Sequence, residues 1–154
     1  MMPFEVRPAE TQDIPALKNL MLQYIVDFYQ SPRPEDDKLH NLITTLIQNE
    51  KGIQFVAQQE TELIGFATLY FSFSTTRADK VTIMNDLFVA EKARGTEAAT
   101  ALFSACEAYT KTNGYAAMLW ETAADNHRAQ RFYEKMGSSP GGFITYSKES
   151  VPVT

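Results

Sequence analysis

The stretch that decides the fold reads NDLFVAEKARGTEAA and occupies residues 85–99 of the 154-residue chain. Its Leu87-Phe88-Val89 run is apolar at consecutive positions, which is typical of a strand buried on both faces in the centre of a sheet. Arg94-Gly95 and small residues follow, and apolar residues then recur with a helical period as far as Tyr109. The stretch therefore predicts a central strand that leads directly into a helix.

Outward from this stretch, the apolar pattern alternates between the period of strands and that of helices. We expect strands at residues 4–7, 54–58, 63–73, 80–90, 116–121 and 143–148, with 54–58 and 63–73 paired as an antiparallel hairpin. We expect helices from Thr11, as N-cap, to 28, from 35 to 47, from 98 to near Gly114, and from a cap at Asp125 or Asn126 to Gly137. This order predicts an α+β (mixed α/β) fold, with a sheet that contains both parallel and antiparallel strands.

The charge of the chain limits its partners. It has 14 Lys+Arg and 19 Asp+Glu, a net charge of −5, which speaks against a nucleic-acid partner. Such acidity is compatible with a cationic partner, and in many proteins it serves solubility alone. No apolar run approaches the ~20 residues of a membrane span, and nothing near the N-terminus resembles a secretory signal. We therefore expect no membrane association and a cytoplasmic location.

Length and the rarer residue types narrow the class further. The 154 residues fit one domain, residues 1–154. The single cysteine, Cys106, cannot form an internal disulfide, and its place among alanines suits a small core residue better than a nucleophile. The two histidines, His40 and His127, have no second ligand at metal spacing, so we expect no metal.

Residues 94–99 admit two interpretations. The N-terminus of a helix presents unpaired N–H groups and a partial positive charge, so it can bind a phosphate, and Arg94 adds a full charge there. The alternative is an ordinary strand-to-helix connection, because the glycines of a P-loop or of a dinucleotide fingerprint are missing.

Residues 125–137 read DNHRAQRFYEKMG and predict an amphipathic helix, which by itself could simply pack on a core. Together with residues 85–99 it resembles the GNAT superfamily of N-acetyltransferases. In that family a strand leads into an Arg-Gly-x-Gly-x-Gly/Ala loop that cradles the pyrophosphate of acetyl-CoA, and a later helix carries Asn-x-x-Ala-x-x-Phe-Tyr-x-x-x-Gly. The helix pattern is matched here at Asn126, Ala129, Phe132, Tyr133 and Gly137.

The resemblance covers nearly the whole chain, and the strands at 85–89 and 120–122 look most like the branch that contains histone and polyamine acetyltransferases. It implies a GNAT-like, mostly antiparallel twisted sheet of about six to seven strands flanked by about four helices. It also implies acetyl-CoA as co-substrate, without a metal. The acetyl group would pass by direct attack in a ternary complex to a primary amine, which could be a small amine, a polyamine or a lysine-like group. Members are often dimers, so a homodimer is compatible with it.

The resemblance also implies roles for particular residues. Acetyl-CoA would contact the strand, the loop, the first turn of the helix after it, and the later helix: Leu87, Phe88, Val89, Arg94, Gly95, Thr96, Glu97, Ala98, Ala99, Thr100, Asn126, Ala129, Phe132 and Tyr133. Tyr133 matches the family's general acid, which protonates the departing thiolate.

The residue types suggest further candidates for the reaction. Asp86 and Glu121, on strands expected to flank the thioester, could each act as general base, or could instead pair with a loop or a helix N-terminus. Carboxylates beside aromatics suit a cationic acceptor, so Tyr24, Asp27, Glu35 and Tyr70 are candidate substrate-binding residues. Helix capping and a solvated face are the alternative explanation of these residues.

One position departs from the family pattern. Glu97 stands where the loop usually has its second glycine. If its carboxylate points at the pyrophosphate from about 6 Å, repulsion is roughly 2–3 kcal/mol per charge pair at an effective dielectric near 20. If it turns to solvent or pairs with Arg94 or Lys92, the loss is small. An alternative function is therefore a CoA-binding regulatory module without turnover.

Overall fold

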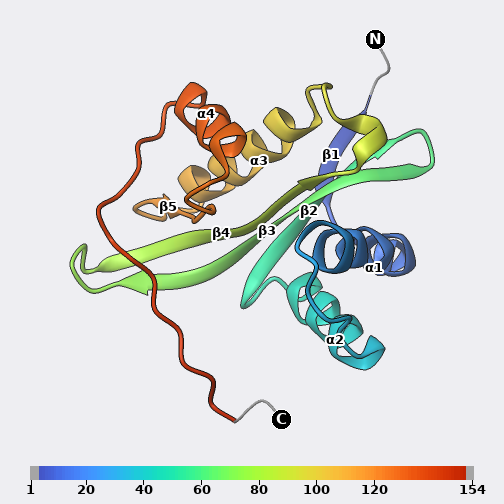
Figure 1. Ribbon diagram of the computed structural model, residues 1–154, viewed down its shortest axis with the longest axis horizontal. Coiled ribbons are helices and arrows are strands. Elements are labelled where there is room, and N and C mark those ends of the chain that lie inside the picture. The colour runs from blue at the N-terminus through green and yellow to red at the C-terminus, as the bar shows by residue number, and fades with distance from the viewer. Residues whose placement is uncertain (1–3, 152–154) are drawn as a thin grey trace. The chain divides into compact units, whose positions relative to one another are not determined.

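A computed structural model describes residues 4–151, and its first compact unit, which ends at Trp120, is built on a five-stranded sheet (Figure 1). The strands lie in chain order: β1 (Glu5–Pro8), β2 (Gly52–Gln59), β3 (Glu62–Ser74), β4 (Asp79–Val89) and β5 (Met118–Leu119). All neighbouring pairs are antiparallel except β4 and β5, which are parallel. The predicted α+β class and the hairpin of β2 with β3 are confirmed.

Helices cover both faces of this sheet (Figure 1). On one face lie α1 (Ile14–Leu22), entered through the 3₁₀ turn η1 (Thr11–Asp13) and continued by the π-helical segment η2 (Gln23–Phe28), and α2 (Asp36–Ile47). The 3₁₀ turn η3 (Glu91–Ala93) connects β4 to α3 (Ala98–Thr112), which covers the other face. The core accordingly has two layers, with Leu17, Ile43 and Phe66 buried on the α1 side and Leu102, Phe103 and Cys106 on α3.

Cys106 is fully buried, and this burial raises the pKa of its thiol to about 12. A thiol that stays protonated and has no access to solvent is a packing residue. The expectation from the sequence is confirmed.

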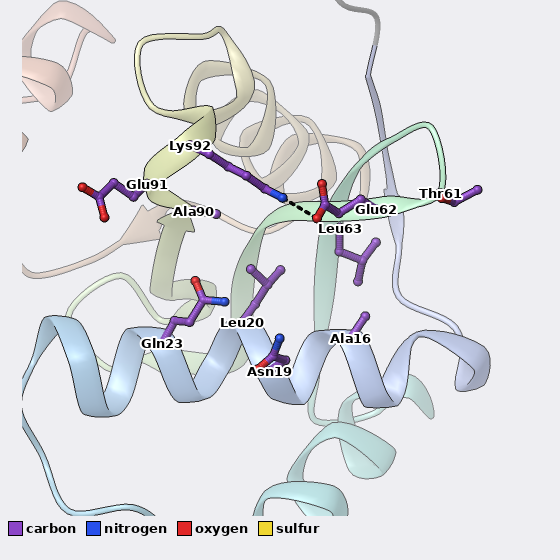
Figure 2. A pocket seen from close by; sticks show the side chains of 10 residues that line it. All are labelled: Ala16, Asn19, Leu20, Gln23, Thr61, Glu62, Leu63, Ala90, Glu91 and Lys92. Carbon is purple, nitrogen blue, oxygen red and sulfur yellow. Dashed lines mark hydrogen bonds and ion pairs between the residues drawn. The ribbon is translucent and has the colours of Figure 1, made fainter.

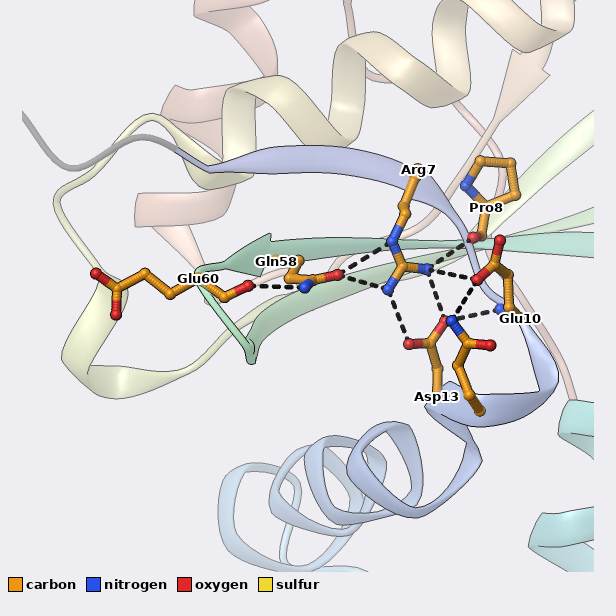
Figure 3. A network of polar contacts seen from close by, with 7 residues as sticks. Arg7, Pro8, Glu10, Asp13, Gln58 and Glu60 are labelled. Atoms are coloured by element: carbon orange, nitrogen blue, oxygen red, sulfur yellow. Dashed lines mark hydrogen bonds and ion pairs between the residues drawn. The ribbon is translucent and has the colours of Figure 1, made fainter.

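The N-terminal strand is tied to the helical layer by an ion pair (Figure 3). The Arg7 guanidinium donates to both oxygens of the Asp13 carboxylate, at 2.7 and 2.9 Å, and to Oε1 of Gln58 at 2.6 Å. Asp13 also accepts the backbone N–H of Glu10 at 2.7 Å, so Glu10 caps the first turn and the prediction of Thr11 as N-cap is wrong. The Arg7 guanidinium therefore joins β1, β2 and the start of the helical layer.

The second compact unit begins at Glu121 and contains α4 (His127–Lys135). Asn126 is its N-cap, since its Oδ1 accepts the N–H of Ala129 at 3.1 Å, and Gly137 ends it with a φ of +91° that favours glycine. Of the two caps that the sequence left open, Asn126 is the one used.

Two strand predictions are corrected. The strand expected at 116–121 is reduced to Met118–Leu119, and the strand expected at 143–148 does not form. A strand needs a hydrogen-bonded neighbour, and none of the described residues of the second unit is in a strand. Phe143 is instead 100% exposed and Tyr146 88% exposed. The sheet therefore has five strands rather than the expected six to seven.

Among the described residues, no helix combines the length and the apolar character that crossing a membrane requires.

Candidate active site

A β-bulge decides where the Asp86 side chain lies. Thr68 on β3 pairs with Asp86, whereas its neighbour Leu69 pairs with Met84, so Asn85 is an extra residue on β4. Side chains alternate between the two faces of a strand, and an extra residue shifts the alternation by one position. Asp86 and Phe88 are thereby directed to the face that α1 covers, while Met84 faces the α3 side.

Two polar side chains lie in line with Asp86 across the sheet. Gln54 on β2 is the register partner of Thr68 on β3, and Thr68 is the partner of Asp86. The Gln54 side chain donates from Nε2 to the Thr68 hydroxyl oxygen at 3.1 Å. Gln54 and Thr68 are buried and Asp86 is half-buried, so a polar line runs from the core to the surface of the sheet.

One aromatic residue of the helical layer, Tyr24, interacts with Asp86 and belongs to a cluster of rings. In η2 the Tyr29 N–H donates to the Tyr24 carbonyl five residues back, at 3.1 Å, which widens the helix locally. The Tyr24 ring lies edge-on to Tyr29 at 5.0 Å and contacts Phe88 at 5.5 Å. Single π-helical turns recur at functional sites because they re-aim side chains in this way.

The pKa values of this cluster are perturbed by burial. Loss of water raises the pKa of Asp86 above its usual range, and the Thr68, Tyr24 and Asn85 side chains act against this by stabilising the charged form. Burial and then the Asp86 charge raise the pKa of Tyr70 to about 12, and the same two causes raise the pKa of Tyr24. Asp86, Tyr24 and Tyr70 therefore form one electrostatic unit.

The second half of β4 has an open edge. The ladder with β5 ends at the Ile83–Leu119 pair in the described chain. The Ala90 N–H donates to the Ile64 carbonyl of β3 at 2.8 Å, and backbone groups of alternate residues point to opposite sides of a strand. Val89 and Leu87 consequently turn their N–H and C=O groups to the open side.

Two further observations bear on this edge. Arg94 Nε donates to the Val89 carbonyl at 3.4 Å, which agrees with the direction derived for Val89. Phe88 is turned the other way, with its backbone toward β3 and its ring buried. Of the three strand residues predicted to contact acetyl-CoA, Leu87 and Val89 have the orientation for backbone contacts.

The loop before α3 presents N–H groups to solvent. Gly95 has a φ of +85°, which favours glycine, and nothing lies within 4 Å of the position a Cβ would take there. The Thr96 hydroxyl donates to the Ala93 carbonyl at 2.6 Å and accepts the Ala98 N–H at 3.3 Å. The first intrahelical hydrogen bond runs from the Ala101 N–H to the Glu97 carbonyl. The N–H groups of Ala99 and Thr100 lie before this bond and therefore have no acceptor within the helix.

Glu97 is the N-cap residue of α3, and its exposed side chain makes no capping hydrogen bond. Lys92 forms its ion pair with Glu62, and the described ion pairs include none between Glu97 and Arg94. The carboxylate thus stands beside the free amides without a compensating cation.

A groove of about 750 Å³ lies beside η3 (Figure 2). Leu20 points into it from α1 and Leu63 from β3, the amide side chains of Asn19 and Gln23 line the α1 side, and the Lys92–Glu62 ion pair lies on the side opposite α1.

The remaining predicted residues have these positions. In the first unit, Asp27 is exposed on η2 and Glu35 is the exposed N-cap of α2, and no contact among the described residues joins either of them to Asp86. In the second unit, Glu121 is exposed, Asn126 and Ala129 form the α4 cap, and the Phe132 and Tyr133 rings meet at 5.5 Å. Among the described residues, no three His, Cys, Asp or Glu side chains gather as metal ligands would.

The sequence reasoning missed Gln54 and Thr68. Both are polar residues inside runs that are otherwise apolar, and that isolation is the signal that could have revealed them.

Comparisons with known proteins agree with this architecture. A model of the acetyltransferase (GNAT) family matches residues 17–138. The uncharacterized N-acetyltransferase YhfO of Bacillus subtilis (strain 168) is 31% identical over 142 residues, which cover 92% of this chain and 94% of that protein.

Solved structures share the fold. A probable acetyltransferase that is 24% identical has a TM-score of 0.80, with 97% of this chain and 98% of that one covered. AAC(6')-Iy, solved with the bisubstrate analogue CoA-S-monomethyl-acetylneamine, is 18% identical, has a TM-score of 0.83, and is covered to 99% by 97% of this chain. The matches do not single out the branch of histone and polyamine acetyltransferases.

Proposed function

Because the chain belongs to the acetyltransferase (GNAT) family, we propose that it transfers the acetyl group of acetyl-CoA to a cationic primary amine. The observation that carries the proposal is the position of Asp86. The bulge directs this half-buried carboxylate to the face that α1 covers, where it interacts with Tyr24 and its charge acts on Tyr70, and the next residue along β4, Leu87, begins the open edge. A base for the amine and backbone groups for the thioester are therefore neighbours on one strand.

The loop and the first turn of α3 would bind the diphosphate of acetyl-CoA. The N–H groups of Ala99 and Thr100 are available as donors, and the absence of a side chain at Gly95 leaves the approach open. The helix dipole adds roughly 0.3–1 kcal/mol for a negative group at this end. Arg94 would move from the Val89 carbonyl to the diphosphate and so free that carbonyl for the pantetheine chain.

The chemical difficulty lies in the amine. A lysine-like amine with a pKa of about 10.4 is neutral in only about one molecule in a few thousand at pH 7, which costs roughly 4–5 kcal/mol. Asp86 would accept its proton, and the raised pKa of this carboxyl strengthens it as a base. The neutral nitrogen then forms the C–N bond at the thioester carbonyl while the C–S bond breaks, and the second proton that the nitrogen loses passes to solvent and replaces the one that the general acid gives to the thiolate. Glu121 is the second candidate base.

Tyr133 would donate its proton to the departing thiolate. This assignment rests on its match to the family pattern, in which the tyrosine follows Asn126, Ala129 and Phe132 at fixed spacing. The N-cap bond from Ala129 to Asn126 supports it, because that bond fixes the first turn of the helix that carries the phenol.

The acceptor is proposed to be cationic because its surroundings are aromatic and acidic. Tyr24 and Tyr70 offer ring faces beside the Asp86 carboxylate, and Asp27 and Glu35 would add negative charge at the entrance. One solved neighbour is an aminoglycoside N-acetyltransferase, so aminoglycosides belong in the acceptor panel beside polyamines and lysine peptides. We further propose that both compact units form one catalytic domain, since the family model spans residues of each.

Thiol release from acetyl-CoA over this amine panel tests the proposal. We expect at least one polyamine, aminoglycoside or lysine peptide to release CoA faster than hydrolysis, and Asp86→Asn to lower kcat/KM at neutral pH by 10²-fold or more, as loss of a general base typically does. Full activity of Asp86→Asn would contradict Asp86 as the base. CoA binding without release for any amine would indicate the regulatory module instead.

A further inference from the structure

Thr68 lies between a buried amide and the Asp86 carboxylate, at the centre of the polar line across β2, β3 and β4. It is fully buried, and Gln54 is 2% exposed. Polar groups are costly in a sheet interior unless each finds a partner, so this line requires an explanation beyond packing.

The direction of the Thr68 hydroxyl follows from its neighbour. Gln54 Nε2 donates to the Thr68 oxygen at 3.1 Å and lies 3.7 Å from the Met21 sulfur, so both contacts of this nitrogen are to acceptors. A hydroxyl whose oxygen already accepts a hydrogen bond still has its own proton to donate. The register partner on the opposite side of Thr68 is Asp86, whose charged form Thr68 stabilises.

The orientation of the Gln54 side-chain amide agrees with a Thr68 hydroxyl that donates to Asp86, although this orientation leaves one amide atom unpaired. With Nε2 toward Thr68, Gln54 Oε1 has no hydrogen-bond partner among the described residues, although it is buried. The reversed amide would accept the Thr68 proton and take it away from Asp86. The observed orientation leaves the unpaired atom on Gln54 and directs the Thr68 donor to the carboxylate.

We infer that Thr68 is a positioning residue that holds the Asp86 carboxylate in its charged, base-competent orientation, and that Gln54 fixes the direction of the Thr68 hydroxyl. The inference rests on the proposed function of Asp86 as general base. It assigns a catalytic consequence to two residues that are buried beneath the candidate site.

The test must separate the titration of Asp86 from that of the other groups that face it. The titratable ones are the phenols of Tyr24 on η2 and Tyr70 on β3, and Asn85 is the polar neighbour on β4. Both phenols stay protonated well above neutral pH, because the Asp86 charge and burial raise their pKa values. A change on the acid side of the pH profile therefore reports on Asp86.

The test compares Thr68→Val, which keeps the shape and removes the hydroxyl, with Thr68→Ser, which keeps the hydroxyl. Without its donor, the charged form of Asp86 is less stable, so the acid limb of kcat/KM should move to higher pH in Thr68→Val. We expect roughly a tenfold loss on that limb, less than about a twofold change on the alkaline plateau, and the wild-type limb in Thr68→Ser. If the role of Thr68 were only structural, Thr68→Val would lower the stability of the fold and leave the acid limb of kcat/KM in place.

A second readout does not depend on activity. Carboxyl ¹³C NMR titration, with Asp86→Asn for assignment, should show a higher pKa for Asp86 in Thr68→Val and a smaller rise in Gln54→Leu. An identical Asp86 titration in wild type and Thr68→Val would overturn the inference, and Thr68→Ala replaces the valine variant if that variant does not fold. An unchanged Asp86 titration in Gln54→Leu would overturn the part assigned to Gln54. If Asp86→Asn keeps the acid limb, the proposed base is wrong, and the NMR comparison still decides the positioning role.

Discussion

Asp13 is the buried carboxylate that pairs with Arg7 of β1 at the start of the helical layer. It is 6% exposed and accepts two hydrogen bonds from Arg7 and one from the Glu10 backbone. The Arg7 hydrogen bonds hold the pKa of Asp13 below its usual range. A pKa that is lower in the folded chain than in the unfolded chain stabilises the fold above the unfolded value, near 3.9, and this stabilisation is lost as the pH falls through the folded pKa.

Asp13→Asn should therefore lower the free energy of unfolding by about 2–3 kcal/mol at pH 7, because Arg7 loses a charged partner. The difference from wild type should shrink in acid as Asp13 itself becomes protonated. Urea denaturation at neutral and acid pH measures this, with Asp27→Asn as the control at an exposed carboxylate. An equal loss in both variants would show that the ion pair contributes nothing specific.

Tyr133→Phe removes only the phenolic oxygen of the proposed general acid. We expect kcat to fall by 10²-fold or more while the affinity for CoA stays within about twofold, since proton donation matters in the transition state and not in binding. Tyr146→Phe is the matched control, because Tyr146 is 88% exposed and has no proposed role. Equal rates for Tyr133→Phe and wild type would exclude this tyrosine as the acid.

Residue types, together with their expected places in the fold, identified Asp86, Tyr24 and Tyr70 as candidates, and the structure brings these three together. It does not join Asp27 or Glu35 to them, because an exposed carboxylate on a helix and a helix cap have the same appearance in a sequence. Gln54 and Thr68 were not identified because the apolar pattern assigns a whole strand to the core, including its few polar residues.

At the scale of elements, the hairpin and the helices followed from periodicity, whereas two irregularities did not. The extra residue Asn85 in β4 and the π-helical segment Gln23–Phe28 both redirect side chains toward the candidate site. Neither leaves a compositional signal, since each depends on pairing or packing with another element. The absent strand at 143–148 has the same origin, because alternation of side chains does not supply a neighbouring edge.

The N-terminus of α3 carries the prediction for Glu97. Its exposed carboxylate has no cation beside it among the described ion pairs, so Glu97→Gln should tighten CoA binding by roughly tenfold at low salt. Screening should reduce the gain as the ionic strength rises. Isothermal titration calorimetry measures the affinity for CoA and its dependence on ionic strength, with Glu91→Gln as the control for an exposed carboxylate on η3. Unchanged affinity at low salt would show that Glu97 points away from the diphosphate.

For the whole molecule, the sequence motifs were sufficient to identify the family. They predicted a strand, a loop and a helix N-terminus in succession, and the structure has β4, the Gly95 loop and α3 in that order. The identity of the acceptor was not predictable to the same depth, since the proposed acceptor site draws on side chains from η2, β3 and β4 that only the folded sheet brings together. The proposed coenzyme site consists largely of backbone groups, and such sites depend on glycine and helix position, which a sequence reports well.

The most direct measurement of the central claim is an amide NMR titration of the labelled chain with CoA. We predict that the N–H signals of Leu87, Val89, Gly95, Ala99 and Thr100 shift and saturate together, while those at the far end of the β3–β4 hairpin, near Ala78, stay in place. If those five signals remain unmoved at a CoA concentration that saturates binding in calorimetry, the open edge of β4 and the first turn of α3 do not hold the coenzyme.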